Sequence, residues 1–149
     1  MIARLLIPGL LAMLLAPTLA SAQDYFGTYS YVKGQRGDQK IPDEKLKNNT
    51  VKIDDGELFL LDSEGTVQFE IHYILDDEPE EGLYKATLEI VKSVMEDAVG
   101  AKAKALAKAY GDTITLIYDF ESQDYPTDFE PKSPSQQLFV LKKVPAGAR

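Results

Sequence analysis

The most regular feature of this chain is the alternation of apolar and polar residues along short segments. In residues 67–75, apolar side chains take every second position, and Gln68, Glu70 and His72 lie between them. A period of two puts one set on each face of a β-strand, so this segment is predicted to be a half-buried strand. Residues 114–120 repeat the pattern and predict a second strand of the same kind.

Turn signals divide the remaining sequence into further predicted strands. Asp55-Gly56 and Glu64-Gly65 are typical of tight turns, and they make residues 50–75 a three-stranded meander. The other predicted strands are residues 26–33, 86–90 and 137–144. Seven or eight short strands with turns between them predict an all-β sandwich or small barrel. Prolines and serines mark residues 122–136 as an irregular excursion before the last strand.

Residues 93–110 allow two interpretations. Ser93 and Glu96 have the spacing of a helix capping box, alanines are dense, and Gly111 could end a helix. Lysines and alanines, however, alternate along residues 101–109, as they would in a strand. Local propensity is a weak guide to the outcome. Both a strand over 102–110 and one helix within 94–110 therefore stay open on the residues alone.

The first 22 residues predict a cleavable secretory signal. Arg4 gives a cationic start, residues 5–15 are apolar, and Ala20-Ser21-Ala22 has the small residues of a cleavage site. The apolar run is shorter than the roughly 20 residues needed to span a bilayer. We therefore expect an exported protein, periplasmic or extracellular, with a single domain over residues 23–149.

Composition narrows the range of partners. The chain has no cysteine, which excludes a disulfide framework and a lipid-modified cysteine. No second apolar run reaches membrane length, so we expect no membrane anchor after the leader is removed. The formal net charge of −8 gives an acidic surface that repels phosphate backbones. Nucleic acid is therefore not an expected partner.

Several segments resemble a family of small secreted bacterial domains. Residues 110–116 (YGDTITL) are the most specific, because they are similar to the family's Gly-Asp-Thr-Leu hairpin. Residues 125–129 and 138–143 also follow its pattern, and Gly27-Thr28-Tyr29 stands where such domains carry glycine, any residue, then tryptophan. The family is uncharacterised and abundant in planctomycete bacteria, and its domains are lipocalin-like (calycin-like) barrels.

The resemblance implies a lipocalin-like antiparallel barrel of about eight strands, with a strand immediately before Gly111. It implies no catalytic residues. Two positions depart from the family pattern: Tyr29 replaces the usual tryptophan, and Tyr125 replaces the arginine that usually precedes the proline. An aromatic contact between these two tyrosines could take the place of the usual pair.

Candidate catalytic and metal-binding residues are few. His72 is the only histidine, and it lies on the polar face of its strand beside Glu70, where a solvated side chain is the ordinary outcome. Without cysteine or a second histidine, a tight zinc or copper site has too few ligands. The acidic residues 76–81 lack the ligand spacing of an EF-hand loop. We therefore predict no catalytic residue, no metal site, no cofactor and no enzymatic activity.

Aromatic residues are the more informative set. An eight-stranded barrel is either filled by its own side chains or holds one small ligand, and inward aromatics suit both. The residues expected to line the barrel are Tyr29, Tyr31, Phe69, Tyr73, Tyr118, Phe120 and Phe129. The leading hypothesis is a protein that binds a small apolar or amphipathic ligand in the barrel. The alternative is an interaction or structural domain of the envelope, with a filled core and an envelope protein as partner.

Overall fold

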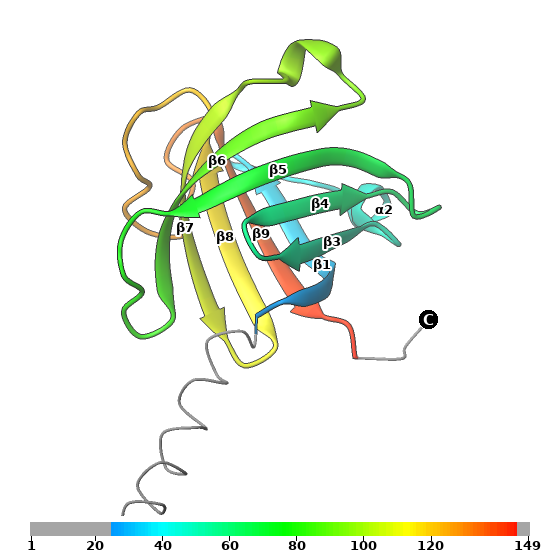
Figure 1. The fold of residues 1–149 in the computed structure, drawn as a ribbon, viewed down its shortest axis with the longest axis horizontal. Coiled ribbons are helices and arrows are strands. Elements are labelled where there is room, and N and C mark those ends of the chain that lie inside the picture. The colour runs from blue at the N-terminus through cyan, green and yellow to red at the C-terminus, as the bar shows by residue number, and fades with distance from the viewer. Residues whose placement is uncertain (1–24, 146–149) are drawn as a thin grey trace, which may run out of the picture.

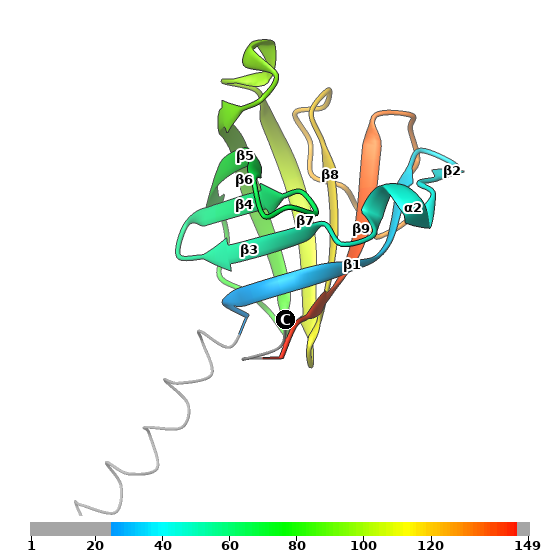
Figure 2. The ribbon, with the colours of Figure 1, turned by 90° about the vertical axis from the view of Figure 1, so that its right-hand side faces the viewer.

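The computed structural model describes residues 25–145, which form a barrel of antiparallel strands (Figure 1). The predicted secretory signal over residues 1–22 lies outside the described residues, as do residues 146–149. A view from the side shows the strands wrapping around one interior (Figure 2). No helix in the described part of the chain has both the length and the apolar character needed to cross a membrane.

Strands account for most of the described chain, and the helical segments are short. The strands are β1 (Gly27–Arg36), β2 (Gln39–Lys40), β3 (Thr50–Asp54), β4 (Glu57–Leu61), β5 (Val67–Leu75), β6 (Leu83–Ser93), β7 (Lys102–Tyr110), β8 (Thr113–Asp119) and β9 (Gln136–Lys143). The helical segments are α2 (Asp43–Leu46) and the 3₁₀ turn η3 (Glu96–Ala98). Sequence patterning did not predict β2 or α2, which are too short to show a period.

Each strand of the wall pairs in antiparallel fashion with its neighbour along the chain, and the pairing of β1 with β9 closes the sheet. The short β2 pairs only with the end of β1, so β1 and β3 to β9 form the wall. The prediction of an all-β antiparallel barrel of about eight strands is confirmed. Closure leaves no long strand edge in the wall open to pairing with another chain.

Residues 93–110 form a turn followed by a strand. The predicted capping box does not form: Ser93 Oγ accepts a hydrogen bond from the Met95 N–H at 2.9 Å, but η3 has Met95 as its N-cap and no side chain caps it. From Lys102 onward the chain is β7, which pairs with β6 on one side and β8 on the other. The helix considered within 94–110 does not form, because hydrogen bonding to two neighbouring strands outweighs local propensity.

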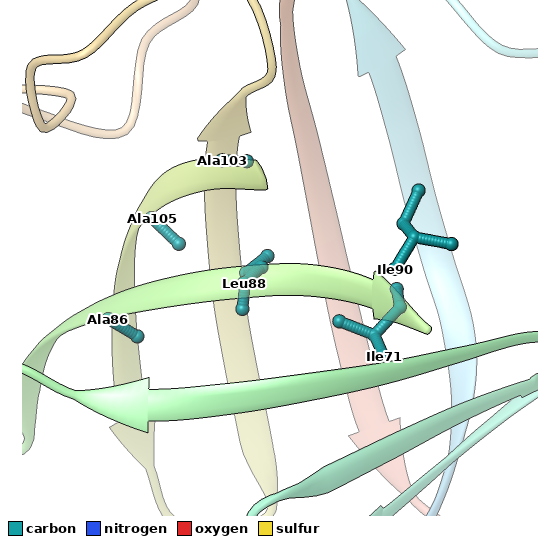
Figure 3. Packing of buried hydrophobic residues seen from close by; sticks show 6 residues of the cluster. All are labelled: Ile71, Ala86, Leu88, Ile90, Ala103 and Ala105. Carbon is teal, nitrogen blue, oxygen red and sulfur yellow. The ribbon is translucent and has the colours of Figure 1, made fainter. Parts of the chain in front are cut away.

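Buried aliphatic and aromatic side chains from opposite walls meet inside the barrel. One cluster comes from β5, β6 and β7, and its side chains are seen in Figure 3: Ile71, Ala86, Leu88, Ile90, Ala103 and Ala105. A second cluster comes from β1, β3, β8 and β9: Tyr29, Val51, Ile53, Ile114 and Leu141. These positions alternate with polar residues along most strands, as the period of two requires.

A third cluster lies on the outside of the wall. Leu106, Ile117 and Leu138 stand opposite one another on β7, β8 and β9, at positions that alternate with inward residues. Phe129, from the long connection between β8 and β9, packs against them. The predicted irregular excursion over 122–136 is therefore confirmed, and it covers an apolar patch that would otherwise face water.

Candidate functional site

The interior of the barrel holds a cavity of about 110 Å³. Its lining comes from β1 and β3 to β9, together with Tyr25 and Phe120 beside the strands, and consists of leucine, isoleucine, valine, alanine, tyrosine and phenylalanine. None of the described residues that line it is charged. The aromatic members of the lining are Tyr25, Tyr31, Tyr73, Tyr84, Tyr118, Phe120 and Phe139. The hydroxyl groups of its tyrosines are thus the only polar side-chain atoms that the lining offers.

Small residues on two neighbouring strands keep the cavity open. Ala86 on β6 and Ala107 and Ala109 on β7 all line the space, where larger side chains would fill it. The alternating alanines of β7 face inward, and Lys104 and Lys108 take positions between them. The pattern that predicted a strand over 102–110 therefore also creates room inside the barrel.

The structure divides the predicted barrel-lining residues into two groups. Four of them line the cavity: Tyr31, Tyr73, Tyr118 and Phe120. The other three pack elsewhere. Tyr29 is buried in the second cluster and Phe69 packs against the first, whereas Phe129 covers the patch on the outer wall. Phe129 belongs to an irregular connection, where no period in the sequence tells inside from outside.

Three aromatic lining residues escaped sequence analysis. Tyr25 precedes the first strand, and Tyr84 lies ahead of the segment 86–90 in which the alternation was clear. Phe139 lies in β9 within a continuous apolar run, residues 138–141, so the pattern could not show which side chains point inward. For Tyr84, extending the alternation of residues 86–90 back by two positions would have found it.

One part of the cavity is built from rings in contact. The Phe139 ring stacks against Tyr118, with centroids 6.1 Å apart, and meets Tyr31 edge-on at 5.5 Å. Phe120 meets Tyr118 edge-on at 5.5 Å. Gly34 permits this packing, because a Cβ there would lie 2.8 Å from a carbon of the Phe139 ring. The four aromatic side chains therefore form a fixed apolar wall beside the cavity.

The hydroxyl groups of Tyr31 and Tyr118 make no hydrogen bond to any described residue, and neither oxygen is fully buried. Burial raises the pKa of Tyr31 to about 12. Burial also raises the pKa of Tyr118, the neighbouring Tyr31 adds to this rise, and the charge of Arg36 opposes it. Protein surrounds Tyr118, yet part of its surface stays accessible because that part faces the cavity. Both phenols are neutral donors in need of an acceptor.

The tyrosines near the start of β1 use their hydroxyl groups within the protein. Tyr29 donates to the carbonyl oxygen of Tyr25 at 2.7 Å, and Tyr73 donates to the carbonyl oxygen of Asp54 at 2.6 Å. The Tyr25 ring meets Tyr84 edge-on, with centroids 5.6 Å apart. These contacts tie the segment before β1 to β1 and β6, and they tie β5 to the end of β3 at Asp54, so they stabilise the fold.

The outer wall carries the only group of possible metal ligands that the described residues bring together. His72 Nε2 lies 3.5 Å from Glu70 Oε2 and 3.7 Å from Glu57 Oε2. The imidazole is half exposed, as predicted from its position on the polar face. Lys92 also faces Glu70 at 4.0 Å. These are ordinary polar contacts on the outer face of β4, β5 and β6, so we build the functional argument on the interior.

Tyr125 does not contact Tyr29, the pairing considered from the sequence. Its hydroxyl donates to Asp76 Oδ2, which also accepts from Thr87 Oγ1 at 2.7 Å, and its ring lies beneath the ammonium groups of Lys85 and Lys104. Tyr125 therefore ties the β8–β9 connection to the outside of the wall.

Comparison with models of protein families, with curated proteins and with solved structures gives no match. The functional argument therefore depends on the geometry and chemistry of the barrel itself.

Proposed function

We propose that this protein binds a small, largely apolar molecule inside its barrel and is not an enzyme. The observation that carries the proposal is the cavity of about 110 Å³ with an uncharged aliphatic and aromatic lining. Transfer of a ligand's apolar surface from water to such a lining is favourable by a free energy of roughly 25 cal/mol for each Å² buried. It offers no carboxylate or imidazole for general acid–base catalysis.

The size of the cavity limits the ligand. Pockets for drug-sized molecules are about 300–1,000 Å³, whereas an engineered cavity of about 150 Å³ in another protein accepts benzene. A single aromatic ring with a short alkyl chain is therefore close to the largest ligand that fits, and a steroid or long-chain lipid would have to expand the barrel.

Titration calorimetry with propylbenzene tests the proposal, because this probe has one ring, a short alkyl chain and no polar group. We expect saturable binding with one site per chain. Ala107→Leu puts a larger side chain into the cavity and should weaken binding by about tenfold or more. Lys108→Leu is the matched control, because the neighbouring residue is exposed and does not line the cavity.

Failure of propylbenzene to bind the unaltered protein would overturn the proposal. Equal binding by the unaltered protein and Ala107→Leu would show that the probe binds elsewhere. Either result would favour the alternative role, an interaction domain that acts through its outer surface. Val94, Met95 and Val99 would then be the first residues to test, because they are the exposed apolar side chains of the connection that projects from the barrel between β6 and β7 (Figure 1).

We also propose that the protein is exported and is related to the lipocalin-like secreted domains it resembles. The leader pattern in residues 1–22 and the closed antiparallel barrel support this. Expression of the full chain in a bacterium, followed by N-terminal sequencing of the exported product, should give a chain beginning at Gln23. An uncleaved protein that stays in the cytoplasm would contradict the export proposal.

A further inference from the structure

The inner face of the barrel carries one row of polar side chains beside the cavity. Arg36 on β1 stands opposite Gln137 on β9, and Gln137 stands opposite Tyr118 on β8. Side chains at directly opposite positions of neighbouring strands project from the same face of a sheet. Because Tyr118 lines the cavity, Arg36 and Gln137 also lie on the inward face, at the end of the barrel where β1 ends and β9 begins.

The Arg36 guanidinium has no acidic partner in the described chain. Its one hydrogen bond is a long one, from Nη2 to Gln137 Oε1 at 3.4 Å, and none of the ion pairs among residues 25–145 includes it. Arg36 is exposed, so a ligand can reach it without first breaking an ion pair.

The neighbouring tyrosine hydroxyl groups are further hydrogen-bond donors that a ligand at Arg36 could use. The Tyr118 hydroxyl has no protein acceptor, and it lies close enough to Arg36 for the positive charge to oppose the rise of its pKa. Tyr31, on the other side of Phe139, is a second donor without an acceptor. An unpaired guanidinium and unpaired phenols beside an apolar cavity suit a ligand with an apolar body and an anionic head.

We propose that the ligand is a small amphipathic carboxylic acid, with its apolar part in the cavity and its carboxylate held by Arg36 and Tyr118. This inference rests on the proposed function, since it assumes that the cavity takes the apolar part. The exposed position of Arg36 keeps the carboxylate at the edge of the barrel, where it need not lose all of its water. The acidic surface of the protein repels anions at long range, so the local contacts with Arg36 and Tyr118 must supply the preference.

Three probes with the same phenylpropyl body separate the affinity due to the apolar body from that due to a hydroxyl or a carboxylate. They are propylbenzene, hydrocinnamyl alcohol and hydrocinnamate, each measured by titration calorimetry at neutral pH. We expect hydrocinnamate to bind about tenfold tighter than the alcohol, or more, as expected for hydrogen bonds to a charged group. Arg36→Gln and Tyr118→Phe should each remove most of this preference. Arg36→Gln should not alter the affinity for propylbenzene by more than about twofold, since Arg36 does not line the cavity.

Two variants serve as matched controls. Lys33→Gln removes one positive charge from the same strand, but at an exposed position that does not line the cavity. Tyr84→Phe removes a phenol from the cavity lining without touching the row of Arg36 and Tyr118. Both should keep the preference for hydrocinnamate.

The outcomes separate the two proposals. If none of the three probes binds, the proposed function fails and this inference fails with it. If all three bind equally well, the cavity binds apolar molecules but the carboxylate inference is wrong. A preference for hydrocinnamate that survives Arg36→Gln, or that is lost in Lys33→Gln or Tyr84→Phe, would also overturn the assignment to Arg36 and Tyr118.

Discussion

Single tyrosines in this barrel occupy environments that differ mainly in what their hydroxyl groups meet. Tyr29 is 2% exposed and donates to a backbone carbonyl, so its hydroxyl belongs to the fold. Tyr31 and Tyr118 face the cavity and have no protein acceptor. The Tyr125 hydroxyl bonds a carboxylate on the outer wall. The residue type alone therefore says little about the role, and the hydrogen-bond partner decides it.

Replacing Tyr29 by phenylalanine tests this distinction. We expect Tyr29→Phe to lower the free energy of unfolding by about 1 kcal/mol, because the Tyr25 carbonyl oxygen loses its buried donor. Tyr31→Phe is the comparison, and it should change stability by less than about 0.5 kcal/mol because no protein hydrogen bond is lost. Urea unfolding of both variants gives the two values. Equal losses would mean that the Tyr25 carbonyl is not a stabilising partner.

Gly82 is the backbone position where a side chain is least tolerable. It lies just before β6 with a φ of +78°, and a Cβ added there would come within 2.5 Å of the Ala109 carbonyl oxygen. We expect Gly82→Ala to cost more than Gly111→Ala, by about 1–3 kcal/mol in urea unfolding. Gly111 has a similar φ of +62° but open space around it, so it carries only the conformational cost of about 1 kcal/mol. Similar losses in both variants would contradict the steric argument.

At the scale of elements, the β8–β9 connection shows how a segment without regular structure can be held in place. Phe129 covers the outward cluster of Leu106, Ile117 and Leu138. We expect Phe129→Ala to lower the free energy of unfolding by about 2–3 kcal/mol, because these apolar side chains would then face water. Propylbenzene affinity should stay the same, since Phe129 lies outside the cavity. A large loss of affinity in the folded variant would show that the connection shapes the interior.

The contact of the same connection with Asp76 should depend on pH. Burial raises the pKa of Asp76, but hydrogen bonds from Tyr125 and Thr87 and the charge of Lys104 outweigh it and hold the pKa below its usual value. A carboxyl with a lowered folded-state pKa adds stability above its unfolded pKa of about 3.9, and this is lost as pH falls through the folded value. We therefore expect Asp76→Asn to be less stable than the unaltered protein at neutral pH.

The stability difference between Asp76→Asn and the unaltered protein should shrink below about pH 4, because both side chains are then uncharged. Urea unfolding over a series of pH values measures it. Asp77→Asn is the control, since Asp77 accepts none of these hydrogen bonds and its difference should vary less with pH. A difference for Asp76→Asn that is constant from neutral pH to pH 3 would contradict the assigned pKa direction.

The sequence predicts elements well where the period of two has room to repeat. Residues 67–75 match β5, and the meander predicted over residues 50–75 contains β3, β4 and β5. In residues 93–110 the local helix signals did not produce a helix, because Ser93 makes only a local hydrogen bond to the Met95 N–H and the chain enters β7 at Lys102. Hydrogen bonding to β6 and β8 determines the conformation of this segment, and local propensity does not take such non-local pairing into account. The position of Phe129 could not be predicted either, because an irregular segment has no repeating pattern that separates inward from outward side chains.

At the scale of the whole molecule, closing the barrel creates the cavity and the row of residues beside it. Arg36, Gln137 and Tyr118 become neighbours only because β1 pairs with β9 and β9 with β8. Sequence analysis found four cavity-lining aromatics from their alternation, yet it did not identify Arg36. Strand register sets that row, and a change of one residue in register would turn Arg36 to the outside. Individual strands were thus predictable, whereas their juxtaposition across the closure was not.

This dependence on closure predicts how a ligand changes stability. The cavity exists only in the closed barrel, so a ligand that fills it binds the folded state and not the unfolded chain. Propylbenzene at 100 times its dissociation constant should therefore raise the free energy of unfolding by about 2.7 kcal/mol. Urea unfolding should show a higher midpoint with an unchanged slope, because the same surface is exposed on unfolding. Ala107→Leu should show a smaller gain at the same probe concentration, because its cavity is partly filled. A lowered slope would mean that the probe binds a loosened barrel, and stabilisation that is equal in both proteins would place the probe outside the cavity.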